Sequence, residues 1–101
     1  MTDRLIGACC SLSAEELRPR LASWRALRDR ATSIEEMPGG ARIQLAAREP
    51  IDAVAGLVAA EAECCPFYTF VLRIDGAARQ LEISAGIGGE PAVRALIGLE
   101  G

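Results

Sequence analysis

The sequence contains no histidine and no lysine, and its only aromatic residues are one Trp, one Tyr and two Phe. Histidine is the most frequent metal-binding side chain and the most frequent general base near neutral pH. Its absence excludes His-containing zinc sites and Ser-His-Asp triads. The scarcity of aromatic residues means that the core of this chain must be built mainly from Leu, Ile, Val and Ala.

The chain carries a net charge of −3 and has a calculated pI near 4.9. An acidic protein repels phosphate backbones, so we expect no nucleic-acid partner. The arginines between residues 18 and 30 are interpreted as the solvated face of a helix. No segment approaches the roughly 20 consecutive apolar residues that span a membrane, and the N-terminus does not read as a secretory signal. We therefore expect a cytoplasmic protein without a membrane partner, in which thiols stay reduced.

Apolar periodicity and turn residues predict seven secondary-structure elements in one domain spanning residues 1–101. A capping box at Ser13–Glu16 marks the start of the first helix, but Pro19 fits best in a first turn, which delays the regular helix to about Arg18. The predicted elements are a helix over 18–31, strands over 32–37 and 41–45, a helix over 51–63, strands over 67–74 and 81–85, and a helix over 91–99.

This order, αββαββα, predicts an α+β two-layer sandwich with a four-stranded antiparallel sheet and helices on one face. The other face of the sheet then needs water or a cover, and a homodimer is one way to supply it. The glycine-rich loop over residues 86–89 lacks the Lys-Ser/Thr of a phosphate-binding P-loop, so we interpret it as a strand-to-helix connection.

The second predicted helix ends at a pair of adjacent cysteines. Its apolar face is predicted to continue into Cys65, and Pro66 disfavours helical geometry at the preceding residue. Thiolates are disfavoured here because the dipole of a helix is negative at its C-terminus and because Glu61 and Glu63 flank the pair. A bound soft metal ion would reverse this, since coordination deprotonates a thiol. The residues predicted to share the apolar face are Ile51, Val54, Ala55, Val58, Ala62 and Cys65.

A second adjacent pair, Cys9 and Cys10, precedes the first helix. If the N-terminal segment docks near the end of the second helix, two or three thiolates converge there. Such a set selects soft ions such as Cu(I), Zn(II), Hg(II) or As(III). Adjacent cysteines fit the C-x₂₋₄-C spacing of structural zinc sites badly. Additional ligands or neighbouring groups are Cys9, Glu61, Glu63 and Tyr68, although carboxylates are normally exposed.

Two other interpretations remain open at this point. A thiol-dependent enzyme, either redox-active or metal-transforming, is one of them. Redox pairs are normally spaced C-x-x-C at a helix N-terminus, whereas this pair follows a helix. The other is an interaction module with inert, buried cysteines, since Cys is among the most buried residue types. No residue is assigned a catalytic role, and the sequence leans against an enzyme.

The chain resembles a family of small bacterial proteins along nearly its whole length. The resemblance is carried by Cys10-Ser11-Leu12, by Arg20-x-x-x-Trp24, and most distinctively by Glu63-Cys64-Cys65-Pro66-Phe67. Similar segments form the C-termini of some heavy-metal-responsive regulators of the mercury-sensing class. The resemblance implies that Cys10, Cys64 and Cys65 form a ligand set for a soft metal ion, and it leaves Cys9 outside the shared pattern.

Overall fold

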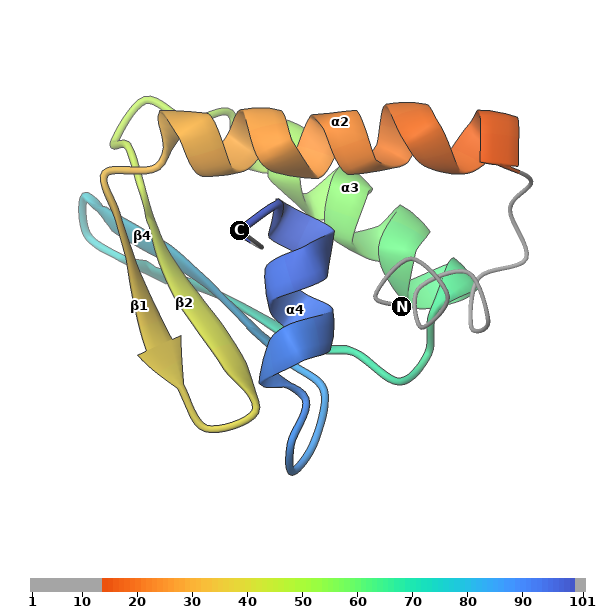
Figure 1. Cartoon of the computed structure of the whole chain (residues 1–101). Coiled ribbons are helices and arrows are strands. Elements are labelled where there is room, and N and C mark those ends of the chain that lie inside the picture. Colours follow the sequence, from red (N-terminus) through yellow and green to blue (C-terminus); the bar gives the residue numbers. More distant parts are fainter. Residues whose placement is uncertain (1–13, 100–101) are drawn as a thin grey trace.

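Helices alternate with pairs of strands along residues 14–99, the part of the chain that the computed structural model describes (Figure 1). The elements are α2 (Ala14–Arg30), β1 (Ser33–Met37), β2 (Gly40–Leu45), α3 (Ile51–Cys64), β3 (Thr69–Asp75), β4 (Ala78–Ser84) and α4 (Glu90–Ile97). Within this range no helix combines the length and the apolar character needed to cross a membrane.

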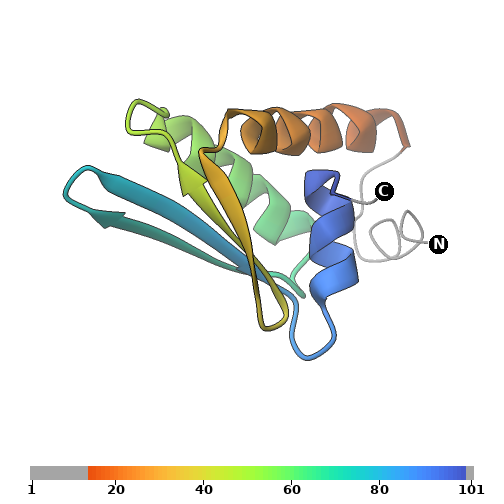
Figure 2. The ribbon, with the colours of Figure 1, turned by 60° about the vertical axis from the view of Figure 1, so that its left-hand side comes forward.

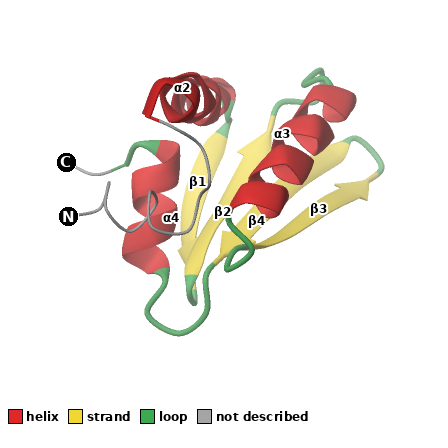
Figure 3. Cartoon of the chain, turned by 90° about the vertical axis from the view of Figure 1, so that its right-hand side faces the viewer, coloured by secondary structure: helices red, strands yellow, loops and turns green. Residues whose placement is uncertain are grey.

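The four strands form one antiparallel sheet in the order β1-β2-β4-β3, so β2 and β4 occupy its centre. Two hairpins, β1–β2 and β3–β4, are joined through the pairing of β2 with β4, which places Ile43 opposite Leu81. The three helices lie on one face of this sheet (Figures 2 and 3). The predicted α+β sandwich and its αββαββα order are confirmed.

The core lies between the sheet and the helices. Strand residues alternate between this core and the opposite face because successive side chains of a strand point in opposite directions. The aromatic ring of Trp24 stacks on that of Phe70 with centroids 5.8 Å apart, which joins α2 to β3. The largest fully buried apolar side chains are those of Trp24, Leu27, Ile43, Leu81, Ile83, Val93, Leu96 and Ile97.

The opposite face of the sheet is polar. Arg42 Nε donates to Glu82 Oε2 at 3.0 Å, and Gln44 Nε2 donates to Gln80 Oε1 at 2.7 Å, so adjacent strands are linked by cross-strand polar pairs. Charged and amide side chains remain hydrated in this position, and an antiparallel sheet with one solvated face is a common arrangement. Water is therefore a sufficient cover for this face, and the homodimer stays a prediction.

Helix α2 begins earlier than predicted. It starts at Ala14 and continues through Pro19 rather than beginning near Arg18. Proline has no N–H to donate, and its ring crowds the carbonyl one turn before it. The carbonyl group that loses its hydrogen bond is that of Glu15, which is exposed, so water can reach it. This explains why the helix tolerates Pro19 in its interior.

The buried face of α3 also differs from the prediction. Ala55 and Ala62 are exposed, whereas Val54, Glu61 and Cys65 are buried. Alanine offers little apolar area, so burying these two positions contributes little to stability. The face of α3 that contacts the core is therefore rotated towards Glu61, which makes a carboxylate part of the protein interior.

Glu90, the first residue of α4, ties this helix to the β1–β2 turn. Its Oε2 accepts a hydrogen bond of 2.9 Å from the N–H of Gly39, and this bond holds the pKa of Glu90 below its ordinary value of 4.5. A carboxylate with a lowered pKa in the folded state stabilises the fold above the unfolded pKa, and loses this contribution as the pH falls. We expect Glu90→Gln to be less stable than the parent at pH 7 and to approach it below about pH 4.5 in urea unfolding.

Glu63→Gln is the control for this experiment, because Glu63 is an exposed glutamate and its substitution should leave the free energy of unfolding at pH 7 within about 0.5 kcal/mol of the parent. A Glu90→Gln destabilisation that is the same at pH 7 and at pH 3.5 would contradict the assigned role.

Candidate thiol site

The two adjacent cysteines lie at the C-terminal end of α3 but in different environments. Cys64 is the last residue of the helix and is half-buried, whereas Cys65 is the C-cap and its side chain is 0% exposed. The N–H of Cys65 donates to the carbonyl of Glu61 at 2.8 Å, which closes the final turn before Pro66. Cys64 is therefore the thiol within reach of solvent, and Cys65 belongs to the core.

A cation from another helix lies next to Cys64. Arg20 Nη1, on α2, is 3.9 Å from Cys64 Sγ. A neighbouring guanidinium favours the thiolate form of a cysteine, and it opposes the unfavourable dipole at the end of α3. The prediction that the arginines of this segment are only solvated is wrong for Arg20, whose side chain is 18% exposed.

Glu61 is the second unexpected member of the site. Its side chain is 0% exposed, which corrects the expectation that this carboxylate is solvated. Glu61 Oε1 accepts a hydrogen bond of 2.9 Å from Trp24 Nε1 and pairs with Arg20 Nη1 at 3.4 Å. No described residue donates to Glu61 Oε2. A buried carboxylate oxygen without a donor is energetically costly, so this arrangement needs a structural or functional reason.

Arg20 is thus shared between the thiol and the carboxylate. Partial burial acts to lower its pKa, but the hydrogen bond to Cys64 and the negative charge of Glu61 outweigh this effect and raise the pKa of Arg20 above its ordinary value. The guanidinium of arginine is in any case always charged in proteins. It supplies a permanent positive charge beside the half-exposed sulfur.

The other predicted site residues are distributed around this centre. Glu63 is exposed on the outer side of α3, so its carboxylate lies in solvent. Tyr68 is 5% exposed, and its hydroxyl donates to the carbonyl of Ala92 at 3.3 Å, which ties it to α4. Cys9 and Cys10 lie outside the described residues, so their predicted approach to Cys64 and Cys65 stays a prediction.

The described part of the chain does not by itself form a metal site with three protein ligands. Within residues 14–99, no three side chains of Cys, Asp or Glu are grouped so that they could hold one ion. A site with three protein ligands at Cys64 and Cys65 would therefore need a donor from outside this range, which is the role predicted for Cys10.

The sequence prediction missed Arg20 and Trp24 as members of the site. The two residues are four positions apart on one helix and therefore lie on the same side of it, one turn from each other. Their Arg-x-x-x-Trp spacing was visible in the sequence, but its partner was not. Only the packing of α2 beside α3 shows that both side chains converge on Glu61.

No protein-family model, curated protein or solved structure matches this chain.

Proposed function

We propose that this chain is a cytoplasmic domain that binds a soft metal ion, for detoxification or for sensing. Cys64 and Cys65 would bind the ion as thiolates, and Cys10 would complete the ligand set. The observation that carries the proposal is the guanidinium of Arg20 at 3.9 Å from the sulfur of the half-exposed Cys64. A thiolate is the form of cysteine that binds metals, and a neighbouring cation favours that form before the ion arrives.

Glu61 supports the same proposal. An isolated arginine would repel an incoming metal cation, but Arg20 also pairs with the buried carboxylate of Glu61 at 3.4 Å. The carboxylate of Glu61 therefore still compensates the positive charge of Arg20 after the thiolate of Cys64 has bound an ion. Coordination also deprotonates the thiols, so binding should release protons and become stronger as the pH rises.

The number of available thiols limits the class of ion. Soft thiolate ligands select ions such as Cu(I), Hg(II) and As(III) over hard ions that prefer oxygen. Structural zinc sites almost always use four ligands, whereas the proposed set contains three. A set of three thiolates would therefore suit ions that accept two or three sulfur ligands.

The first test is titration of the reduced full-length protein with Hg(II), Cu(I), As(III) and Zn(II), following the ultraviolet charge-transfer band of the metal–thiolate bond. We expect tight binding of at least one of the first three ions. Cys64→Ser and Cys65→Ser should each weaken it by about a hundredfold or more, since ligand loss has a larger effect than the 10- to 100-fold change caused by outer-shell substitutions. Cys10→Ser should also weaken binding, and Cys9→Ser is the matched control that should not.

The result that would defeat the metal proposal is a Cys64→Ser, Cys65→Ser double variant that binds every ion like the parent. That outcome would favour the structural interpretation, in which the cysteines only fill the core. If Cys64→Ser loses metal binding but Cys10→Ser retains it fully, the metal site stands and Cys10 is not its third ligand.

A thiol-dependent enzyme is the second candidate, and it is favoured by the orphan oxygen of Glu61. A buried carboxylate with one oxygen to which no residue of 14–99 donates, connected to Cys64 through Arg20, would serve as a proton donor or acceptor for a reaction at the thiol. This interpretation predicts catalytic turnover that Glu61→Gln abolishes. The metal-binding proposal predicts instead that Glu61→Gln still binds the ion, but more weakly, because Arg20 loses the negative charge that compensates it.

A further inference from the structure

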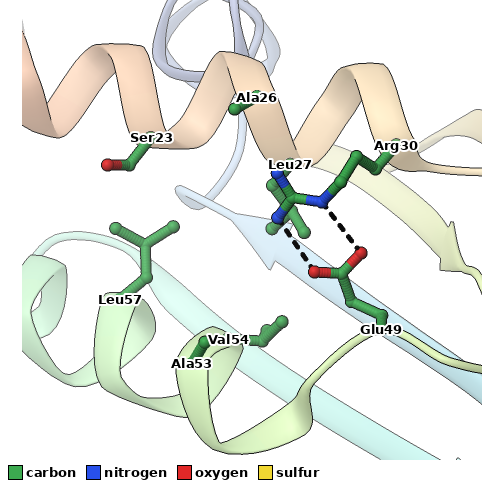
Figure 4. A pocket seen from close by; sticks show the side chains of 8 residues that line it. All are labelled: Ser23, Ala26, Leu27, Arg30, Glu49, Ala53, Val54 and Leu57. Carbon is green, nitrogen blue, oxygen red and sulfur yellow. Dashed lines mark hydrogen bonds and ion pairs between the residues drawn. The ribbon is translucent and has the colours of Figure 1, made fainter.

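A groove separates α2 from α3 on the surface of the protein (Figure 4). Its volume is about 400 Å³, within the range of 300–1,000 Å³ that is typical of small-molecule sites. Leu57 and Val54 on α3 and Leu27 on α2 point towards the space between the helices. The remaining lining residues are Ser23, Ala26, Arg30, Glu49 and Ala53.

Polar bridges between the two helical segments stand at both ends of this groove. At one end, Arg30 Nε and Nη2 donate to the two carboxylate oxygens of Glu49 at 3.1 and 2.9 Å. At the other end, Trp24 and Arg20 hold Glu61, which lies one helical turn beyond Leu57. Fixed contacts between two helical segments set how far apart the walls of a surface groove lie. The two bridges provide those contacts, and the small residues between them leave the space open.

The ion pair between Arg30 and Glu49 presents mainly its positive partner to solvent. The side chain of Glu49 is 3% exposed and both of its oxygens are engaged by Arg30, whereas the side chain of Arg30 is 54% exposed. The hydrogen bonds from Arg30 to Glu49 fix the guanidinium and raise the pKa of Arg30. A molecule entering the groove at this end therefore meets a fixed cation next to an apolar trough.

We propose that this groove binds a small amphipathic anion, an aromatic or aliphatic carboxylate whose apolar body lies on the more exposed lining residues Ala26, Ala53 and Leu57, above a floor formed by Leu27 and Val54. Its carboxylate would pair with the exposed side of the Arg30 guanidinium, which accepts carboxylates in a fixed geometry. This inference is independent of the metal-binding proposal, because the groove contains no cysteine and the Glu61 bridge stands between it and Cys64.

The test uses 2-naphthoate and its uncharged analogue 2-naphthylmethanol as probes, with binding to the full chain measured by calorimetry and by NMR. We expect 2-naphthoate to bind the parent and Ala53→Phe, which fills the groove, to weaken it by about tenfold or more. Ala55→Phe is the matched control, since Ala55 is an exposed alanine of the same helix outside the groove. Arg30→Gln should weaken 2-naphthoate by about tenfold and 2-naphthylmethanol by less than about twofold, while Arg30→Lys should retain most of the preference for the anion.

Binding of 2-naphthoate that Ala53→Phe leaves unchanged, or no binding at millimolar concentration, would overturn the proposal. Equal affinity of the parent for the two probes would overturn the assignment of an anionic ligand. If Arg30→Gln fails to fold, Arg30→Lys and Ala53→Phe still decide the test. Arg30→Lys retains the positive charge, and Ala53→Phe alters only an exposed position. Cys64→Ser should bind 2-naphthoate like the parent, which separates this inference from the fate of the metal proposal.

Discussion

Replacing Glu61 by alanine should destabilise the protein by about 3 kcal/mol, a large part of the stability of a domain of this size. The substitution removes the acceptor of the Trp24 Nε1–H bond, and Trp24 is 0% exposed, so this donor would be left unsatisfied in the core. An orphaned buried donor costs about 1–3 kcal/mol, and loss of the partner of Arg20 adds to this. Thermal unfolding should show a decrease in Tm of roughly 10–20 °C.

Two further variants make this prediction specific to Glu61. Glu63→Ala changes an exposed carboxylate two residues along the same helix and should alter the free energy of unfolding by no more than about 0.5 kcal/mol. Glu61→Gln keeps an oxygen that can accept from Trp24, so it should be more stable than Glu61→Ala. Equal stability of Glu61→Ala and Glu63→Ala would show that the buried bridge does not hold α2 on α3.

Gly40→Ala should have an effect at least as large, about 3–4 kcal/mol or more, because the added atom collides with backbone rather than with a flexible side chain. A Cβ built at Gly40 would lie 1.7 Å from the carbonyl oxygen of Ile83 and 2.8 Å from the Cα of Ser84. Gly40 pairs with Ser84 in the central β2–β4 ladder, so relieving this overlap would separate the strands that join the two hairpins. Circular dichroism and urea unfolding measure the outcome.

Gly56→Ala is the matched control for this substitution. Gly56 lies inside α3, it is exposed, and a Cβ at this position meets nothing within 4 Å. Alanine reduces the conformational freedom of the unfolded chain and is favoured in helices, so Gly56→Ala should stabilise the protein by about 0.5–1 kcal/mol. Similar unfolding curves for the two glycine variants would contradict the close approach of β2 to β4.

The structure changes what the cysteine pair can be expected to do. The sequence predicts that the thiolate form of Cys64 is disfavoured, because Cys64 ends a helix and lies near the acidic residues Glu61 and Glu63. In the folded protein, one of these acids, Glu61, is directed into the core and Arg20 lies against the sulfur. The permanent charge of Arg20 therefore opposes the unfavourable helix dipole at the end of α3.

The sequence alone determined the elements and their order, because local patterns suffice for these features. Alternation at Ala41, Ile43 and Leu45 identifies a half-buried strand whatever its partner is. Pro66 ends α3 at the cysteine pair for a steric reason that involves only neighbouring residues. The apolar alternation of two hairpins and the helical spacing between them were enough to predict an α+β sandwich.

Only the tertiary structure decided which side of α3 faces the core and which arginine contacts Cys64. Positions 61 and 62 are adjacent on the helix, and periodicity alone could not choose between a glutamate and an alanine for the interior. The choice depends on Trp24 and Arg20, which lie 37 and 41 residues away in the sequence and both contact the Oε1 atom of Glu61. A buried charge is tolerated only where partners reach it, and those partners come together only when the chain has folded.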